Sequence, residues 1–163
     1  MIKVFIGGSR KITRINPLIR ARLDRIVRQG IPVVIGDANG ADKAVQAYLK
    51  DAGYPNVEVF CMAGRCRNNL GGWKTRIVTA PPNKRGFEFY SLKDEEMTSE
   101  STVGLMLWDG ESRGTLANVA RMVEQHKKVV VYVAPHKTFQ TIRQKADLEG
   151  ILSSSLVEEQ LTY

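Results

Sequence analysis

The chain has 163 residues, of which 43% are hydrophobic and 25% charged, as in a globular protein that forms one domain. No apolar run approaches the ~20 residues that a membrane helix needs, so we expect no membrane contact. The net charge of +7 favours acidic partners: nucleotides, nucleic acid or phosphorylated metabolites. Residues 1–8 are too short and too β-like for a signal peptide, and we therefore expect a cytoplasmic protein.

Apolar, β-branched runs alternate with segments of helical periodicity. In chain order, the pattern predicts strands over 2–6, 31–35, 57–61, 74–79, 103–107 and 128–133. It predicts helices over 15–28, 41–52, 88–99 and 114–126, and a short helix over 138–148. Asn16 is the expected N-cap of the first helix, and Pro17 occupies its first turn. Residues 1–150 are expected to form a single domain, followed by a weakly ordered, Ser-rich and then acidic tail over 151–163.

The alternation predicts an α/β fold: a Rossmann-like, doubly wound, mainly parallel sheet with helices on both faces. Right-handed crossovers place the carboxyl ends of all parallel strands at one edge, where the ligands of open α/β sheets bind. The sequence contains neither a G-x-G-x-x-G dinucleotide fingerprint nor a G-x-x-x-x-G-K-[ST] phosphate loop. Other turns at this edge therefore have to recognise the ligand.

Three glycine-rich turns follow predicted strands and supply the candidate binding residues. A strand that ends in glycine and leads into a helix leaves backbone N–H groups free to bind phosphate. The first turn offers Gly7, Gly8, Ser9 and Arg10, and the second offers Gly36, Asp37, Asn39, Gly40 and Asp42. The third turn offers Trp108, Asp109, Glu111, Ser112, Arg113, Gly114 and Thr115.

Each turn has an expected role and a structural alternative. Arg10 suits a phosphate because its guanidinium binds in a bidentate manner, although the first turn also reads as an ordinary tight turn. Asp37 is placed to accept hydrogen bonds from ribose hydroxyls. Asp42 and Thr115 are alternatively capping residues of the helices that follow them. Trp108 is either a core aromatic residue or a wall on which a base stacks.

The two cysteines, Cys61 and Cys66, are expected to be reduced thiols. A disulfide is not expected in a cytoplasmic chain. A zinc site needs four ligands, and His126 and His136 lie far away in sequence, so no metal is expected.

The order of the motifs resembles that of one known superfamily. Gly-Ser-Arg after the first strand, Gly-Asp-Ala-Asn-Gly-Ala-Asp after the second, Arg67-Asn68 after the third and Ser-Arg-Gly-Thr before a late helix occur in this order. Over residues 2–133 the chain is similar to the SLOG superfamily of Rossmann-like proteins. The resemblance implies that a nucleotide or nucleotide-derived ligand binds at the glycine-rich edge, with Arg67 and Asn68 reaching the same edge. Because the family often forms homodimers, it also implies a homo-oligomer.

One departure from the family bears on activity. The related LOG-type hydrolases carry a catalytic glutamate three residues after the threonine of their Gly-Gly-x-Gly-Thr loop, and the matching residue here is Asn118. An amide cannot act as a general base or nucleophile at neutral pH. The first hypothesis is therefore a binding protein, a sensor or carrier of a ligand such as a nucleoside phosphate or an ADP-ribose-like molecule. No further cofactor is expected.

Two other functions compete with this hypothesis. An enzyme that acts at an N-glycosidic bond, such as a nucleotide hydrolase or a nucleoside deoxyribosyltransferase, stabilises an oxocarbenium-like state with a carboxylate. The candidates for that carboxylate are Asp37, Asp109, Glu111 and Glu88. Nucleic-acid binding, as in the DNA-processing relatives, ranks lower because 24 basic residues against 17 acidic ones is a modest excess. No aromatic-rich basic strip for single strands is evident either.

Overall fold

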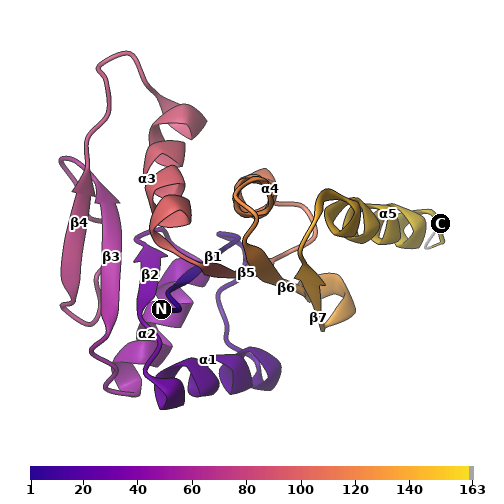
Figure 1. The fold of residues 1–163 in the computed structure, drawn as a ribbon, viewed down its shortest axis with the longest axis horizontal. Coiled ribbons are helices and arrows are strands. Elements are labelled where there is room, and N and C mark those ends of the chain that lie inside the picture. The colour runs from indigo at the N-terminus through magenta and orange to yellow at the C-terminus, as the bar shows by residue number, and fades with distance from the viewer. Residues whose placement is uncertain (162–163) are drawn as a thin grey trace.

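The computed structural model describes residues 1–161, and the side chains of residues 1–153, as a sheet between two layers of helices (Figure 1). The strands are β1 (Val4–Gly8), β2 (Val33–Gly36), β3 (Val57–Met62), β4 (Lys74–Val78), β5 (Val103–Trp108), β6 (Lys128–Val133) and β7 (Thr138–Ile142). The helices are α1 (Pro17–Gln29), α2 (Ala41–Asp51), α3 (Gly86–Glu100), α4 (Arg113–Glu124) and α5 (Lys145–Leu161). A short 3-10 turn, η1 (Ala134–His136), joins β6 to β7.

The strands form one sheet in the order β4-β3-β2-β1-β5-β6-β7. Neighbouring strands are parallel except for β6 and β7, which are antiparallel. From β1 the chain builds the sheet outward to β4 and then returns to the other side of β1 as β5. The predicted α/β, Rossmann-like fold is therefore confirmed. The direction of winding reverses between β1 and β5, which is where ligands of such sheets bind.

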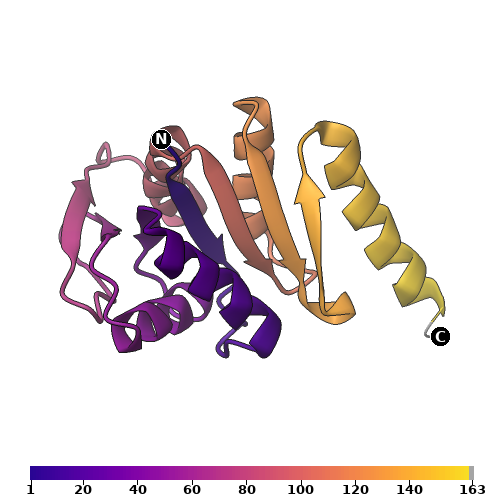
Figure 2. The same cartoon turned by 60° about the horizontal axis from the view of Figure 1, so that its bottom comes forward.

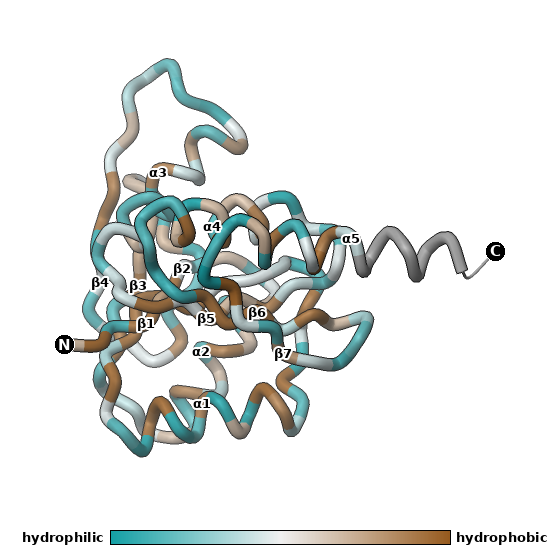
Figure 3. Tube along the Cα trace, turned by 45° about the vertical axis from the view of Figure 1, so that its right-hand side comes forward, coloured by the Kyte–Doolittle hydropathy of each residue, from teal (hydrophilic) through white to brown (hydrophobic). Residues whose placement is uncertain are grey.

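Helices cover both faces of the sheet and bury one apolar cluster on each (Figure 2). In Figure 1, α1 and α2 lie on one face, and α3, α4 and α5 lie on the other. Strand residues alternate between the two clusters: Val4 and Ile6 of β1 face α1 and α2, whereas Phe5 faces α3 and α4. Hydropathy along the chain follows this layout, with the hydrophobic segments concentrated in the central strands (Figure 3). Within the described residues, no helix combines the length and apolar character needed to span a bilayer.

The first helix has the N-cap that its sequence predicts. Asn16 Oδ1 accepts a hydrogen bond from the Ile19 amide at 2.8 Å, and Pro17 is the first helical residue. Gly30 ends the helix with φ of 65°, a left-handed conformation that glycine adopts without a steric penalty. These caps fix the path from β1 into α1 and back to β2.

The chain beyond β6 differs from the sequence-based expectation. The helix expected over 138–148 is wrong for its first half, because Thr138–Ile142 forms β7 and α5 begins only at Lys145. Lys137 has a left-handed backbone, with φ of 52°, and reverses the chain so that β7 pairs with β6. Thr138, Phe139, Thr141 and Ile142 are β-branched or aromatic residues that suit a strand. The boundary predicted at residue 150 falls inside α5, and residues 162–163 of the expected tail lie outside the described residues.

Candidate functional site

A cleft of about 740 Å³ opens at the carboxyl ends of β1, β2 and β5, between the first turns of α3 and α4. Its volume falls within the range of small-molecule sites. The predicted site residues that line it are Gly7, Gly8, Ser9, Arg10, Gly36, Asp42, Arg67, Asp109, Glu111, Ser112, Gly114, Thr115 and Asn118. The predicted residues that do not line it are Asp37, Asn39, Gly40, Asn68, Trp108 and Arg113. The fold thus brings together residues of all three turns, which lie up to a hundred positions apart.

The first two turns are packed backbone against backbone. Gly40 has φ of 84°, and a Cβ atom at this position would collide with the backbone of Arg10. A Cβ atom at Gly8 would likewise collide with the carbonyl oxygen of Leu107 and with Ala41. The carbonyl oxygen of Ser9 accepts a hydrogen bond from the Ala41 amide at 3.0 Å, which joins the two turns. Glycine is therefore required at these positions so that the backbones can approach one another.

The third turn ends at the start of α4 with donors that have no acceptor. Ser112 is the N-cap of α4, and its Oγ accepts a hydrogen bond from the Thr115 amide at 3.4 Å. Within residues 1–161, the amides of Arg113 and Gly114 have no hydrogen-bond partner. The helix dipole adds partial positive charge at this point. The alternative role of Thr115 as N-cap is wrong, because Ser112 takes that position.

Asp109 shapes the third turn and stays charged. Its Oδ1 accepts hydrogen bonds from the amides of Glu111, at 3.0 Å, and Ser112, at 2.7 Å. Burial raises the pKa of Asp109, but these amide hydrogen bonds and one from the Ser9 side chain outweigh it and lower the pKa below its usual value. At the mouth of the cleft, Lys11 of the first turn forms an exposed ion pair with Glu111 at 2.9 Å.

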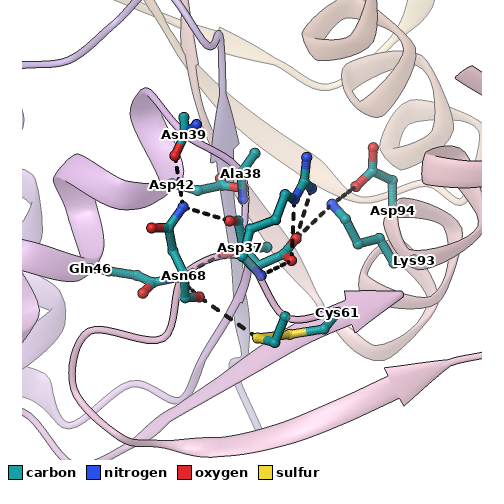
Figure 4. Close-up of polar contacts among 12 residues, drawn as sticks. Asp37, Ala38, Asn39, Asp42, Gln46, Cys61, Asn68, Lys93 and Asp94 are labelled. Carbon is teal, nitrogen blue, oxygen red and sulfur yellow. Dashed lines mark hydrogen bonds and ion pairs between the residues drawn. A yellow bond between two sulfur atoms is a disulfide. The ribbon is translucent and has the colours of Figure 1, made fainter. Parts of the chain in front are cut away.

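The second turn is held by a buried ionic network (Figure 4). Asp37 is only 1% exposed and accepts hydrogen bonds from the Arg67 amide at 2.9 Å and from Arg67 Nη2 at 2.8 Å. Burial raises the pKa of Asp37, but the bonds from Arg67 lower it further than burial raises it. Asn68 Nδ2 donates to the carbonyl oxygen of Asp37 at 2.8 Å and to Asn39 Oδ1 at 3.0 Å. Asp37 is thus occupied within the protein, and its predicted contact with a ribose finds no support in this arrangement.

Asp42 replaces Asp37 as the second-turn carboxylate at the cleft. Its Oδ2 accepts a hydrogen bond from the Ala38 amide at 3.1 Å, and no donor among the described residues bonds its Oδ1. A Cβ atom at Gly36 would lie 2.6 Å from Asp42 Oδ2 and 3.0 Å from Lys93 Nζ, so both charged groups pack against this glycine. Burial raises the pKa of Asp42 to about 6, although the Lys93 charge opposes the rise. Its oxygen therefore bonds the loop before α2 rather than an amide of the first helical turn, and Asp42 does not cap the helix by a hydrogen bond.

The sequence-based prediction missed the contribution of α3. This helix lines the cleft with Phe87, Tyr90, Ser91, Lys93, Asp94 and Met97. Lys93 is 4% exposed, and its Nζ lies 3.3 Å from Asp94 Oδ1 and 4.0 Å from Asp37 Oδ1. The spacing of Phe87, Tyr90, Ser91 and Asp94 places them on one helical face. Because this face mixes apolar, polar and charged residues, it gives no amphipathic pattern that the sequence could reveal.

Two predicted site residues have structural partners. Trp108 is 1% exposed, and its Nε1 donates a hydrogen bond to the Ser112 carbonyl at 3.2 Å, so it is a core residue and not a stacking wall. Asn118 does line the cleft, and its Oδ1 accepts a hydrogen bond from Arg121 Nη1 at 2.7 Å. Glu88 does not line the cleft, and its side chain is exposed.

The expectation of reduced cysteines is wrong for this structure. Cys61 at the end of β3 and Cys66 in the following loop form a disulfide. It closes the short loop directly before Arg67, the residue that pairs with Asp37. The spacing of the cysteines alone did not reveal the pairing, because the loop has to turn back on β3 to bring the two sulfur atoms together. An isolated antiparallel bridge between Met62 and Arg65 marks this turn.

Among solved structures, the fold resembles that of DNA processing protein A from Helicobacter pylori, which was described for its single-stranded DNA binding mode. The match has a TM-score of 0.58 at 16% identity and covers 80% of this chain and 64% of that one. This chain therefore spans less than two thirds of the length of the protein that it matches. No family model and no curated protein matches the sequence. The likeness shows a shared Rossmann-like fold.

Proposed function

We propose that the chain binds a nucleotide or nucleotide-derived ligand in the cleft, as a sensor or carrier. The observation that carries the proposal is the convergence of two glycine-rich turns and the open N-terminus of α4 at the point between β1 and β5 where the winding reverses. A phosphate there would meet the amide of Gly114, which lines the cleft and has no hydrogen-bond partner among the described residues. The Arg10 guanidinium lines the same cleft and has no carboxylate partner among the described side chains.

The opposite wall of the cleft suits a sugar. Asp42 offers an oxygen without a hydrogen-bond donor among the described residues, and Lys93 and Asp94 lie beside it. The vicinal hydroxyls of a ribose can donate hydrogen bonds to this carboxylate oxygen. The cleft therefore combines a cationic end for phosphate with an acidic wall for hydroxyls, as a nucleoside phosphate or an ADP-ribose-like ligand requires.

Isothermal titration with AMP, ADP-ribose and ribose 5-phosphate tests this proposal. Arg10→Met should weaken binding of all three about 10- to 100-fold, because a hydrogen bond to a charged group contributes about 1.5–3 kcal/mol. Arg14→Met removes the same charge from an exposed position that does not line the cleft, and it is the matched control. No binding of any of these ligands at millimolar concentration would refute the proposal.

Cleavage of an N-glycosidic bond is the second candidate, and Asp42 is the observation that favours it. A buried carboxyl group with a pKa of about 6 in a cleft has the right proton affinity for general acid–base catalysis near neutral pH. Asp109 supplies a second, ionised carboxylate for an oxocarbenium-like state. Base release from nucleoside monophosphates, followed by chromatography, should fall about 100-fold or more in Asp42→Asn. Unchanged release in Asp42→Asn and Asp109→Asn would eliminate these assignments.

Two expectations about partners also remain proposals. The fold likeness keeps single-stranded nucleic acid as a lower-ranked ligand, for which binding should fall steeply with salt. Titration of an oligonucleotide at two salt concentrations tests it. The expected homo-oligomer would appear as a mass above 18.2 kDa in light scattering.

A further inference from the structure

We infer that Phe87, positioned by Tyr90, is a stacking platform for the base of the bound nucleotide. The inference rests on the proposed function and narrows it: the ligand carries an aromatic base and is not a simple sugar phosphate. Nothing in the sequence motifs assigns a base-binding residue, because Trp108, the one aromatic residue within the three turns, is buried in the core.

Phe87 lies at the mouth of the cleft with most of its side chain in solvent. It is 60% exposed although it is a large apolar residue in the first turn of a helix. A Cβ atom at Gly114 would lie 4.0 Å from Phe87 Cε2, so the edge of the ring faces the N-terminal turn of α4 across the space that a side chain at Gly114 would fill. The ring thus stands directly beside the proposed phosphate site. Since Gly114 has no side chain, the space between the ring and the α4 amides stays open.

Tyr90 continues this aromatic surface one turn further along α3. It follows Phe87 by three positions, which places both rings on the same face of the helix. The Arg67 guanidinium carbon lies 4.7 Å from the centre of the Tyr90 ring, and that of Arg10 lies 5.9 Å away. These cation–π contacts tie α3 to the loops after β3 and β1. They hold the helix, and therefore Phe87, in place relative to the phosphate site.

A nucleobase is the ligand group that fits this surface best. A nucleotide carries a flat aromatic base as well as a phosphate and a sugar, and the cleft offers an exposed aromatic ring beside the N-terminus of α4 and carboxylates elsewhere in its lining. Stacking of a base on an aromatic side chain is favourable for every base, because each has a π face. Ser91, which lines the cleft one turn along α3 from Phe87, already donates its hydroxyl to the Phe87 carbonyl at 2.7 Å. We therefore expect affinity from stacking and only a weak preference among bases.

The test compares AMP with ribose 5-phosphate, which has the same phosphate and sugar but no base. In isothermal titration, Phe87→Ala should weaken AMP binding about 5- to 100-fold and leave ribose 5-phosphate binding unchanged. Phe87→Trp keeps an aromatic face and should retain AMP affinity. Leu18→Ala truncates another exposed apolar side chain, on α1, and should change neither affinity. Because Phe87 is exposed, its variants should fold, which circular dichroism confirms.

The outcomes separate the platform from the proposed function. If Phe87→Ala leaves AMP affinity unchanged while Arg10→Met weakens both ligands, the platform is refuted and the nucleotide site stands. If the wild-type protein binds neither ligand, the proposed function fails and the platform fails with it. A single-stranded oligonucleotide is titrated in parallel. If the oligonucleotide binds, Phe87→Ala weakens that binding, and AMP does not bind, the ligand is a nucleic-acid strand. This result would overturn the inference of a free nucleotide.

Discussion

Replacing Asp42 by asparagine should remove a pH-dependent loss of stability from the fold. The Asp42 carboxyl group is buried beside Lys93, with Asp37 and Asp94 nearby, and its pKa rises from the usual 3.8 to about 6, chiefly because of burial. A raised carboxyl pKa means that the native state holds the proton more tightly than the unfolded chain. The ionised form is therefore a cost to folding at neutral pH. Asparagine has nearly the same shape and carries no charge.

The size of the effect follows from the shift in pKa. A rise of about two units corresponds to about 3 kcal/mol of unfolding free energy, at 1.36 kcal/mol per unit. Well below pH 3.8 the carboxyl is protonated in both states and contributes nothing. Between pH 4 and about 6 the unfolded chain ionises while the native protein stays protonated, so stability falls as the pH rises. Relative to Asp42→Asn, the wild-type protein should therefore lose up to about 3 kcal/mol by pH 7.

Urea unfolding of both proteins at half-unit steps from pH 4 to 7.5 measures this difference directly. Subtraction of the two curves cancels the groups that they share, including Asp37, whose lowered pKa acts in the opposite direction. Asp51→Asn, which removes an exposed carboxylate at the end of the same helix, controls for the change in net charge. The reasoning is refuted if the difference between wild type and Asp42→Asn stays constant over this range or has the opposite sign.

Two further substitutions test how the turns are held. Gly40→Ala should destabilise the fold by at least ~2 kcal/mol more than Gly53→Ala, because both glycines have positive φ but a Cβ at Gly53 meets no atom within 4 Å. Equal losses in thermal unfolding would argue against the close approach of the first two turns. Arg67→Met should cost about 3–5 kcal/mol at pH 7, since it leaves Asp37 buried without its main partner. Adding Asp37→Asn to this variant should recover part of the loss in urea unfolding, and no recovery would contradict the buried pair.

The sequence pointed to the turn residues that line the cleft but not to those that α3 contributes. Glycines after strands are local signals, and their convergence at one edge follows from the parallel sheet. The residues Phe87, Tyr90 and Lys93 carry no such signal, because an isolated helix does not show which face will meet a cleft. Both Asp37 and Asp42 were predicted binding residues, and only the returning loop after β3 places Arg67 on Asp37 and leaves Asp42 in the lining of the cleft.

The sequence by itself determined the α/β alternation, the N-cap of the first helix and the glycine-rich turns that line the cleft. These features depend on hydrophobic periodicity and on the backbone freedom of glycine and proline, which act over a few neighbouring residues. The tertiary structure alone decided the disulfide, the antiparallel β7, the ionic network around Asp37 and the wall supplied by α3. Each of these requires segments distant in sequence to meet at specific distances, and their geometry depends on the packing of the whole chain rather than on any local preference.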